Sequence, residues 1–142
     1  MLVVDVNVLI YAFQPSSPKH AAWRAWLESA RAMPFAVPDV VALGFVRIVT
    51  NRRVFAEPAT VAEALAFLDA LRASPGWREL ERPRDCWTRL EELCAATGAR
   101  GADVPDAWLA ALALDWGATL ITADRGFAAY PGLRWLDPTS AT

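Results

Sequence analysis

The stretch VPDAWLAALALDWGATLITADRGF, residues 104–127, is the clearest indication of the fold class because it joins a helix, a helix stop, a strand and a polar turn. Small and apolar residues at helical spacing predict a closely packed helix over 104–116. Gly117 follows directly, at the position where glycine commonly ends a helix. The apolar run 119–122 predicts a buried strand, and Asp124 comes just after it. A helix that leads into such a strand is typical of α/β proteins.

The rest of the chain continues this alternation. Residues 2–6, LVVDV, form a β-branched run suited to a strand that is buried on both faces. Thr60 and Glu63 have the spacing of a capping box at one helix start. We therefore expect a three-layer α/β fold with a mostly parallel central sheet, built as one domain over 1–142. Further strands are expected at 35–37, 77–80 and 133–136, and further helices at 6–13, 19–32, 39–50, 60–74 and 85–97.

The composition limits the possible locations and partners. Hydrophobic residues make up 55% of the 142 residues and charged residues 21%, with a net charge of −2. No apolar run approaches the length of a membrane span, and the N-terminus lacks the basic stretch of a signal peptide, so we expect a cytoplasmic protein with no membrane contact. The apolar excess, which includes seven Trp, suggests surfaces that a partner or a second copy covers. Any attraction to phosphate must be local, because the net charge is slightly negative.

Three carboxylates mark the points where apolar segments stop or a helix begins: Asp5, Asp106 and Asp124. The carboxyl ends of parallel strands meet at one edge of a sheet, so acids distant in sequence can share a pocket there. Clustered carboxylates repel one another unless a cation lies between them, and their hard oxygen atoms suit Mg²⁺ or Mn²⁺. Each acid also has an ordinary role open to it, in a turn or at a helix start. Asp103 competes with Asp106 for the cap of its helix, and we expect Asp103 to be the cap.

Three blocks of sequence together resemble a known family. They are VVDVNVLIYAF at 3–13, VRIVTNRRVF at 46–55 and VPDAWLAALALDWGATLITADRGFAAYPGLRW at 104–135. In this order and spacing they resemble a PIN domain, and specifically the VapC toxin ribonucleases of bacterial toxin–antitoxin pairs. The likeness covers nearly the whole chain, and the last block is the most specific part of it.

The resemblance implies an activity and a set of partners. It implies an endoribonuclease that depends on Mg²⁺ or Mn²⁺ and hydrolyses RNA phosphodiester bonds, leaving 5′-phosphate and 3′-hydroxyl ends. It also implies a homodimer and a tight complex with a cognate antitoxin protein. The metal ligands would be Asp5, Asp106 and Asp124.

Other residues would support that site. Asn7 would orient Asp5 or touch a ligand, and Thr122 lies two residues before Asp124. Arg125 would neutralise the site or contact RNA phosphate, although a solvated arginine is an equally ordinary interpretation.

One position departs from the family pattern. PIN domains usually carry a Glu on the helix after the second strand, and Gly44 stands at that place here. Asp39, at the expected start of the same helix, is the best substitute as a catalytic carboxylate. The departure leaves a second hypothesis open, a catalytically weak PIN-like module that binds RNA or protein. A phosphoacceptor fold, which also uses an acid after the first strand, is disfavoured because the only Lys, Lys19, is far from the last strands.

Overall fold

The computed structural model describes residues 1–140, and its strands form one parallel sheet. The central strands are β1 (Leu2–Val4) and β3 (Thr119–Ile121), with β2 (Phe35–Ala36) beside β1 and β4 (Trp135–Leu136) beside β3. All three pairings are parallel. From β1 the chain proceeds to β2 on one side and later to β3 on the other, so the strand order reverses between β1 and β3. Open α/β sheets bind ligands outside the carboxyl ends of the strands at such a point.

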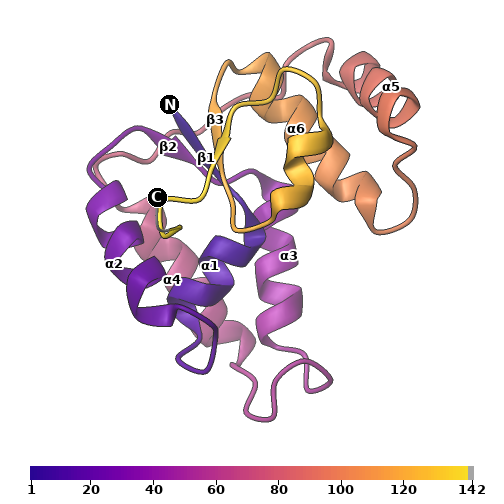
Figure 1. Cartoon of the computed structure of the whole chain (residues 1–142). Coiled ribbons are helices and arrows are strands. Elements are labelled where there is room, and N and C mark those ends of the chain that lie inside the picture. The colour runs from indigo at the N-terminus through magenta and orange to yellow at the C-terminus, as the bar shows by residue number, and fades with distance from the viewer. Residues whose placement is uncertain (141–142) are drawn as a thin grey trace.

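The helices pack in two groups around these strands (Figure 1). In that view α1 to α4 are gathered below the strands, and α5 with α6 lies to the right. Helix α1 packs against α2 and α3, α3 packs against α4 and α6, and α5 packs against α6. The expected α/β fold with a parallel sheet is therefore confirmed. The helices are α1 (Val6–Phe13), α2 (His20–Ala30), α3 (Asp39–Val49), α4 (Val61–Arg72), α5 (Cys86–Thr97), α6 (Asp103–Asp115) and the short 3-10 helix η1 (Arg125–Ala129).

Local signals in the sequence explain where several elements begin and end. Thr60 and Glu63 form the expected capping box at the start of α4, with each side chain accepting from the other residue's backbone N–H at 3.1 Å. Gly117 ends α6 with a φ of 63°, a conformation that costs other residues energy. Val4 and Ile121, paired across β1 and β3, are buried as expected for strands covered on both faces.

The strand expected at 77–80 is wrong. Phe35 accepts a hydrogen bond from Arg78 at 2.8 Å and donates one to Gly76 at 2.9 Å, which gives a single bridge between Phe35 and Trp77. Strand β2 is only two residues long, so it offers no ladder along which this segment could continue. Within residues 1–140, no helix is long and apolar enough to span a bilayer.

Candidate active site

The site lies at the carboxyl edge of β1 and β3. Asp5 follows β1, and its backbone N–H donates to the Ile121 carbonyl of β3 at 3.0 Å. Thr122 follows β3, and its hydroxyl donates to Asp5 Oδ2 at 2.7 Å. The parallel register of β1 and β3 therefore brings Asp5 beside residues more than a hundred positions away in the chain.

Asp5 is a buried carboxylate with three hydrogen bonds. Its side chain is 3% exposed, and Oδ1 caps α1 by accepting from the Val6 N–H at 2.7 Å. Oδ2 accepts from Thr122 and from Asn7 Nδ2, the latter at 3.0 Å. Burial raises the pKa of Asp5, while the hydrogen bonds from Thr122, Val6 and Asn7 lower it and the charge of Asp124 raises it further. The carboxylate is thus fixed in orientation, and the helix cap and the site use the same side chain.

Asn7 and Thr122 tie the loop that carries Asp124 to Asp5. Asn7 Oδ1 accepts from the Ala123 N–H at 3.2 Å, and Thr122 Oγ1 accepts from the Asp124 N–H at 3.0 Å. Asp124 is exposed, and its Oδ1 caps η1 by accepting from the Gly126 N–H at 2.8 Å. Together with the hydrogen bond from Asn7 Nδ2 to Asp5 Oδ2, these contacts place Asn7 between Asp5 and the loop of Asp124.

Asp106 enters the site from the first turn of α6. It is half-buried, and burial raises its pKa to about 6, with further increases from the charges of Asp5, Asp124 and Asp103. These four acids therefore share one electrostatic environment. Within residues 1–140, none of them forms an ion pair with a basic side chain.

Asp103 lines the cavity beside the acid cluster, a position that the sequence did not predict. It was expected to cap α6, but it is the first residue of that helix and makes no capping hydrogen bond. Instead it lines a cavity of about 300 Å³ together with Asp106, Asp124 and Tyr130. The spacing of Asp103 and Asp106 was the available signal, since side chains three residues apart lie on the same face of a helix.

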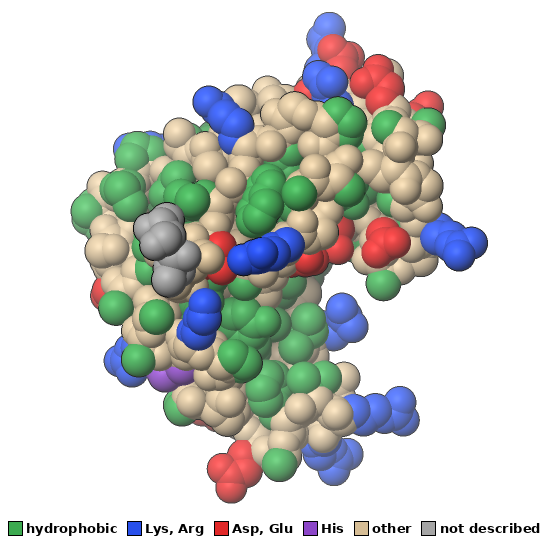
Figure 2. Space-filling model, in the orientation of Figure 1, with side chains coloured by type: hydrophobic (Ala, Val, Ile, Leu, Met, Phe, Trp, Pro, Cys, Tyr) green, Lys and Arg blue, Asp and Glu red, His purple; other side chains and the backbone are tan. Residues whose placement is uncertain are grey.

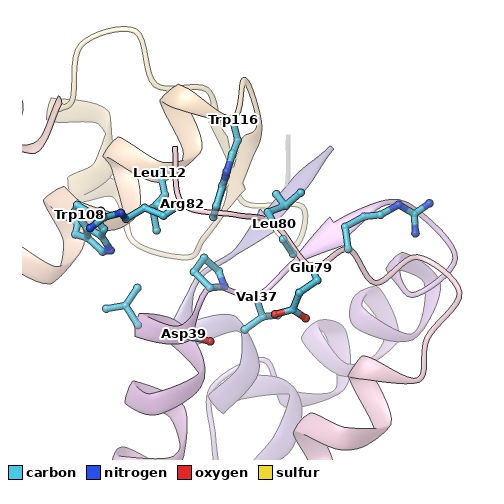
Figure 3. Close-up of a pocket in the computed structure, with 12 residues that line it drawn as sticks. Val37, Asp39, Glu79, Leu80, Arg82, Trp108, Leu112 and Trp116 are labelled. Atoms are coloured by element: carbon cyan, nitrogen blue, oxygen red, sulfur yellow. The ribbon is translucent and has the colours of Figure 1, made fainter. Parts of the chain in front are cut away.

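Asp39 lies apart from the acid cluster. Asp39 starts α3 and lines a separate cavity of about 250 Å³ with Glu79, Arg82 and Trp108 (Figure 3). It is absent from the charges that raise the pKa of Asp5 and Asp106.

Gly44 is half-buried, and a Cβ there would meet only Val6 Cγ2, at 3.6 Å. A longer side chain at this position would therefore begin beside the residue that follows Asp5. Arg125 is exposed and forms no ion pair within the described part of the chain.

The donor set suits a partly hydrated hard cation better than a closed cage. Among residues 1–140, no three His, Cys, Asp or Glu side chains are grouped closely enough to hold a metal ion by themselves. Mg²⁺ commonly uses only one or two carboxylates and keeps several water molecules or substrate oxygens. The uncompensated charge around Asp5 and Asp106 fits such a cation, because a nearby positive charge would favour the ionised form of both groups.

Comparison with known proteins agrees with this architecture. The family model of the PIN domain matches residues 2–133. The VapC ribonuclease Mb2897 of Mycobacterium bovis is 44% identical over 140 residues, which cover 97% of this chain and 95% of that protein. Ribonuclease VapC25 of Mycobacterium tuberculosis is 36% identical, with 97% of this chain and 99% of that protein covered.

Solved structures with the same fold include two with much lower sequence identity. VapBC2 from Rickettsia felis, bound to a DNA fragment from its promoter, matches with a TM-score of 0.70 and 17% identity, covering 95% of this chain and 96% of that one. VapBC-1 from nontypeable Haemophilus influenzae matches with a TM-score of 0.65 and 18% identity, covering 98% of both chains. The fold, the full-length identity to named relatives and the matching family model lead to one conclusion: this chain belongs to the PIN domain family, among the VapC ribonucleases.

Proposed function

We propose that this protein is a divalent-metal-dependent endoribonuclease that acts as the toxin of a toxin–antitoxin pair. The observation that carries the proposal is the group of acids at the carboxyl edge of β1 and β3, which has no basic partner within residues 1–140. Full-length relatives at 36–44% identity bear the name ribonuclease. The substrate we infer is RNA, and the bond hydrolysed is a phosphodiester.

The proposed roles follow from how each side chain is held. Asp5, Asp106 and Asp124, with water molecules completing the coordination, would hold Mg²⁺ or Mn²⁺. When bound, such a cation lowers the pKa of a water molecule and stabilises charge on the leaving oxygen. Asn7 and Thr122 keep Oδ2 of Asp5 in one orientation through their hydrogen bonds.

Basic side chains supply the local attraction for RNA phosphate. Figure 2 shows acidic side chains along a hollow on this face and Lys or Arg side chains on both sides of it. Arg125, exposed beside Asp124, is one of the candidates for a phosphate contact.

The test is the loss of cleavage in isosteric variants. Asp5→Asn and Asp106→Asn each remove one negative charge with little change in shape, and each is expected to lower cleavage of structured RNA by at least about a hundredfold. Cleavage is measured with Mg²⁺, with Mn²⁺ and with EDTA. Asp69→Asn, on the exposed face of α4, is the matched control and should retain full activity. Undiminished cleavage by both folded site variants would eliminate the proposal.

A second candidate is a PIN-like module that binds RNA or protein but cleaves weakly. Two observations favour it: Gly44 replaces the usual Glu, and the described acids do not form a closed metal cage. Titration calorimetry with Mn²⁺ separates the candidates, because the weak module predicts RNA binding without measurable heat of metal binding.

We also infer a cognate antitoxin and a homodimer. Solved structures with this fold include VapBC2 from Rickettsia felis and VapBC-1 from Haemophilus influenzae. Apolar side chains such as Leu43, 70% exposed, and Trp87, 60% exposed, offer surface that a partner would cover. Co-expression with the neighbouring reading frame should yield a complex that survives purification, and light scattering should give the mass of a dimer for the chain alone. If the neighbouring protein does not co-purify, the antitoxin is contradicted. If light scattering gives the mass of a monomer, the homodimer is contradicted.

A further inference from the structure

Tyr130 presents an unpaired hydroxyl to the cavity beside the acids. The side chain is 8% exposed, and its ring lies 5.7 Å from that of Phe127. No residue within 1–140 forms a hydrogen bond with this hydroxyl. In the same part of the chain, Asp115 Oδ2 is the only side-chain oxygen or nitrogen that is both fully enclosed and without a hydrogen-bond partner, so the Tyr130 hydroxyl is not fully enclosed. The Tyr130 hydroxyl is therefore accessible, and the space that it reaches is the cavity lined by Asp103 and Asp106.

The chemistry of this cavity selects the kind of group that it can hold. Three carboxylates, Asp103, Asp106 and Asp124, line it, and no basic residue of the described chain does. A phosphate would be repelled from such a wall, whereas a group that donates hydrogen bonds would be attracted. Tyr130 stays protonated at neutral pH, since burial and the nearby acids raise its pKa to about 12. With Asp106 and Asp124 assigned to the cation, Asp103 and Tyr130 remain, and a group that both of them hold donates to a carboxylate and accepts from a tyrosine hydroxyl.

A ribose 2′-hydroxyl meets both requirements, because it is a donor and an acceptor at once. The position of the 2′-hydroxyl on an RNA strand also agrees with the position of the cavity. Asp106 and Asp124 belong both to the cavity and to the proposed metal site, so whatever fills the cavity lies next to the scissile phosphate. The sugar attached to that phosphate is the neighbouring part of an RNA strand. A cavity of about 300 Å³ has the size of the smaller ligand pockets found in proteins.

We propose that Tyr130 and Asp103 form a subsite for the ribose 2′-hydroxyl beside the scissile phosphate, through which the enzyme selects RNA over DNA. Tyr130 donates a hydrogen bond to the 2′-oxygen, and the 2′-hydroxyl donates to the Asp103 carboxylate. This assignment rests on the proposed ribonuclease function. Hydrolysis by a water molecule does not consume the 2′-hydroxyl, so selection of RNA has to come from binding contacts of this kind.

The test compares substrates that differ by one oxygen atom. A cleaved RNA hairpin is made with a single 2′-deoxynucleotide on either side of the cleaved bond in turn. The wild-type protein should lose about tenfold in kcat/KM at one of these positions, the net value of two hydrogen bonds. In Tyr130→Phe, which keeps the ring and leaves the contact with Asp103, this penalty should shrink to about threefold. Tyr11→Phe, at the other tyrosine of the chain, should keep the full penalty. An equal penalty in Tyr130→Phe and wild type, or no penalty in wild type, would overturn the subsite.

A binding measurement separates this inference from the nuclease proposal. Fluorescence anisotropy in EDTA gives the affinity for an RNA oligonucleotide and for the same sequence in 2′-deoxy form. Wild type should bind the RNA about tenfold more tightly, and in Tyr130→Phe and in Asp103→Ala, which each lose one of the two hydrogen bonds, this preference should fall to about threefold. A wild-type protein that cleaves no RNA would refute the nuclease alone. Equal wild-type affinity for both strands would refute the subsite whatever the cleavage result.

Discussion

Asp5 caps α1 with one oxygen and directs the other toward Thr122 and Asn7, so the cost of burying its charge is offset by three hydrogen bonds. The Asp106 side chain accepts no hydrogen bond within residues 1–140, so nothing offsets the effect of its burial, which raises its pKa to about 6. The Asp106 carboxylate, which suits a cation, therefore makes the metal-free protein less stable at neutral pH. Active sites commonly carry this kind of cost, because function requires groups that the fold alone would not choose.

Asp106→Asn is expected to stabilise the metal-free protein at pH 7. The folded pKa of Asp106 is about 6, above the ordinary value of 3.8, so the folded state binds the proton more tightly and loses stability as pH rises from about 4 to about 6. Two pKa units correspond to about 3 kcal/mol, and half-exposure of the group reduces the expected gain to roughly 1–2 kcal/mol. Urea unfolding in EDTA at pH 4 and pH 7 measures it. The gain should be present at pH 7 and nearly absent at pH 4, and Asp69→Asn should show none; a variant no more stable than wild type at pH 7 contradicts the argument.

Helix α5 is held on α6 by a polar contact at one end of their interface. Arg89 Nε of α5 donates to Asp115 Oδ1 of α6 at 3.0 Å, and the Asp115 side chain is 12% exposed with Oδ2 unpaired within residues 1–140. Residues of both helices, Thr97 and Asp103 among them, line the cavity beside the acids. The position of α5 on α6 therefore helps to shape the proposed RNA subsite.

Arg89→Gln should destabilise the protein more than Glu92→Gln, which removes the second acid that Arg89 contacts. Without Arg89 the nearly buried Asp115 carboxylate loses its charged partner, which we expect to cost about 1–2 kcal/mol. Glu92 is 62% exposed and lies 3.6 Å from Arg89, so Glu92→Gln should cost less than about 0.5 kcal/mol. Denaturant unfolding of both variants gives the comparison, and equal losses would show that the contact with Asp115 has no special weight.

Elements also show which parts of the structure the sequence can predict. The helix over 104–116 and its stop at Gly117 were expected within a residue or two, because close packing and a left-handed glycine leave local signals. The prediction of a strand at 77–80 was wrong, since the residues of this segment do not reveal that the neighbouring strand β2 is only two residues long. Tyr130 was not anticipated in the site, because the turn after η1 carries it there and nothing in its neighbours records that path.

In the whole molecule, the parallel register of β1 and β3 brings Asp5 beside the loop that carries Asp124, and α6 brings Asp106 to the same edge. Residues next to one another in the sheet come from opposite ends of the chain, so the cluster exists only when the molecule is folded. The sequence could predict this meeting in outline, since carboxyl ends of parallel strands share one edge. It could not predict that Asp39, the first residue of α3, would line a separate cavity, because the direction of α3 is set by packing against α1 and α4.

A cation that binds only the folded arrangement should stabilise the whole molecule. At a Mn²⁺ concentration about ten times its Kd, the expected gain is about 1.4 kcal/mol, a rise in Tm of roughly 3–5 °C for a chain of this size. Asp5→Asn and Asp106→Asn should abolish most of the rise, because each removes charge from the shared cluster. Asp39→Asn should keep the rise in full, since Asp39 lines the other cavity. Differential scanning fluorimetry with Mn²⁺ and with EDTA measures all four proteins. A rise that disappears in Asp39→Asn would move Asp39 into the metal site, and a rise unchanged in Asp5→Asn and Asp106→Asn would place the cation elsewhere on the molecule.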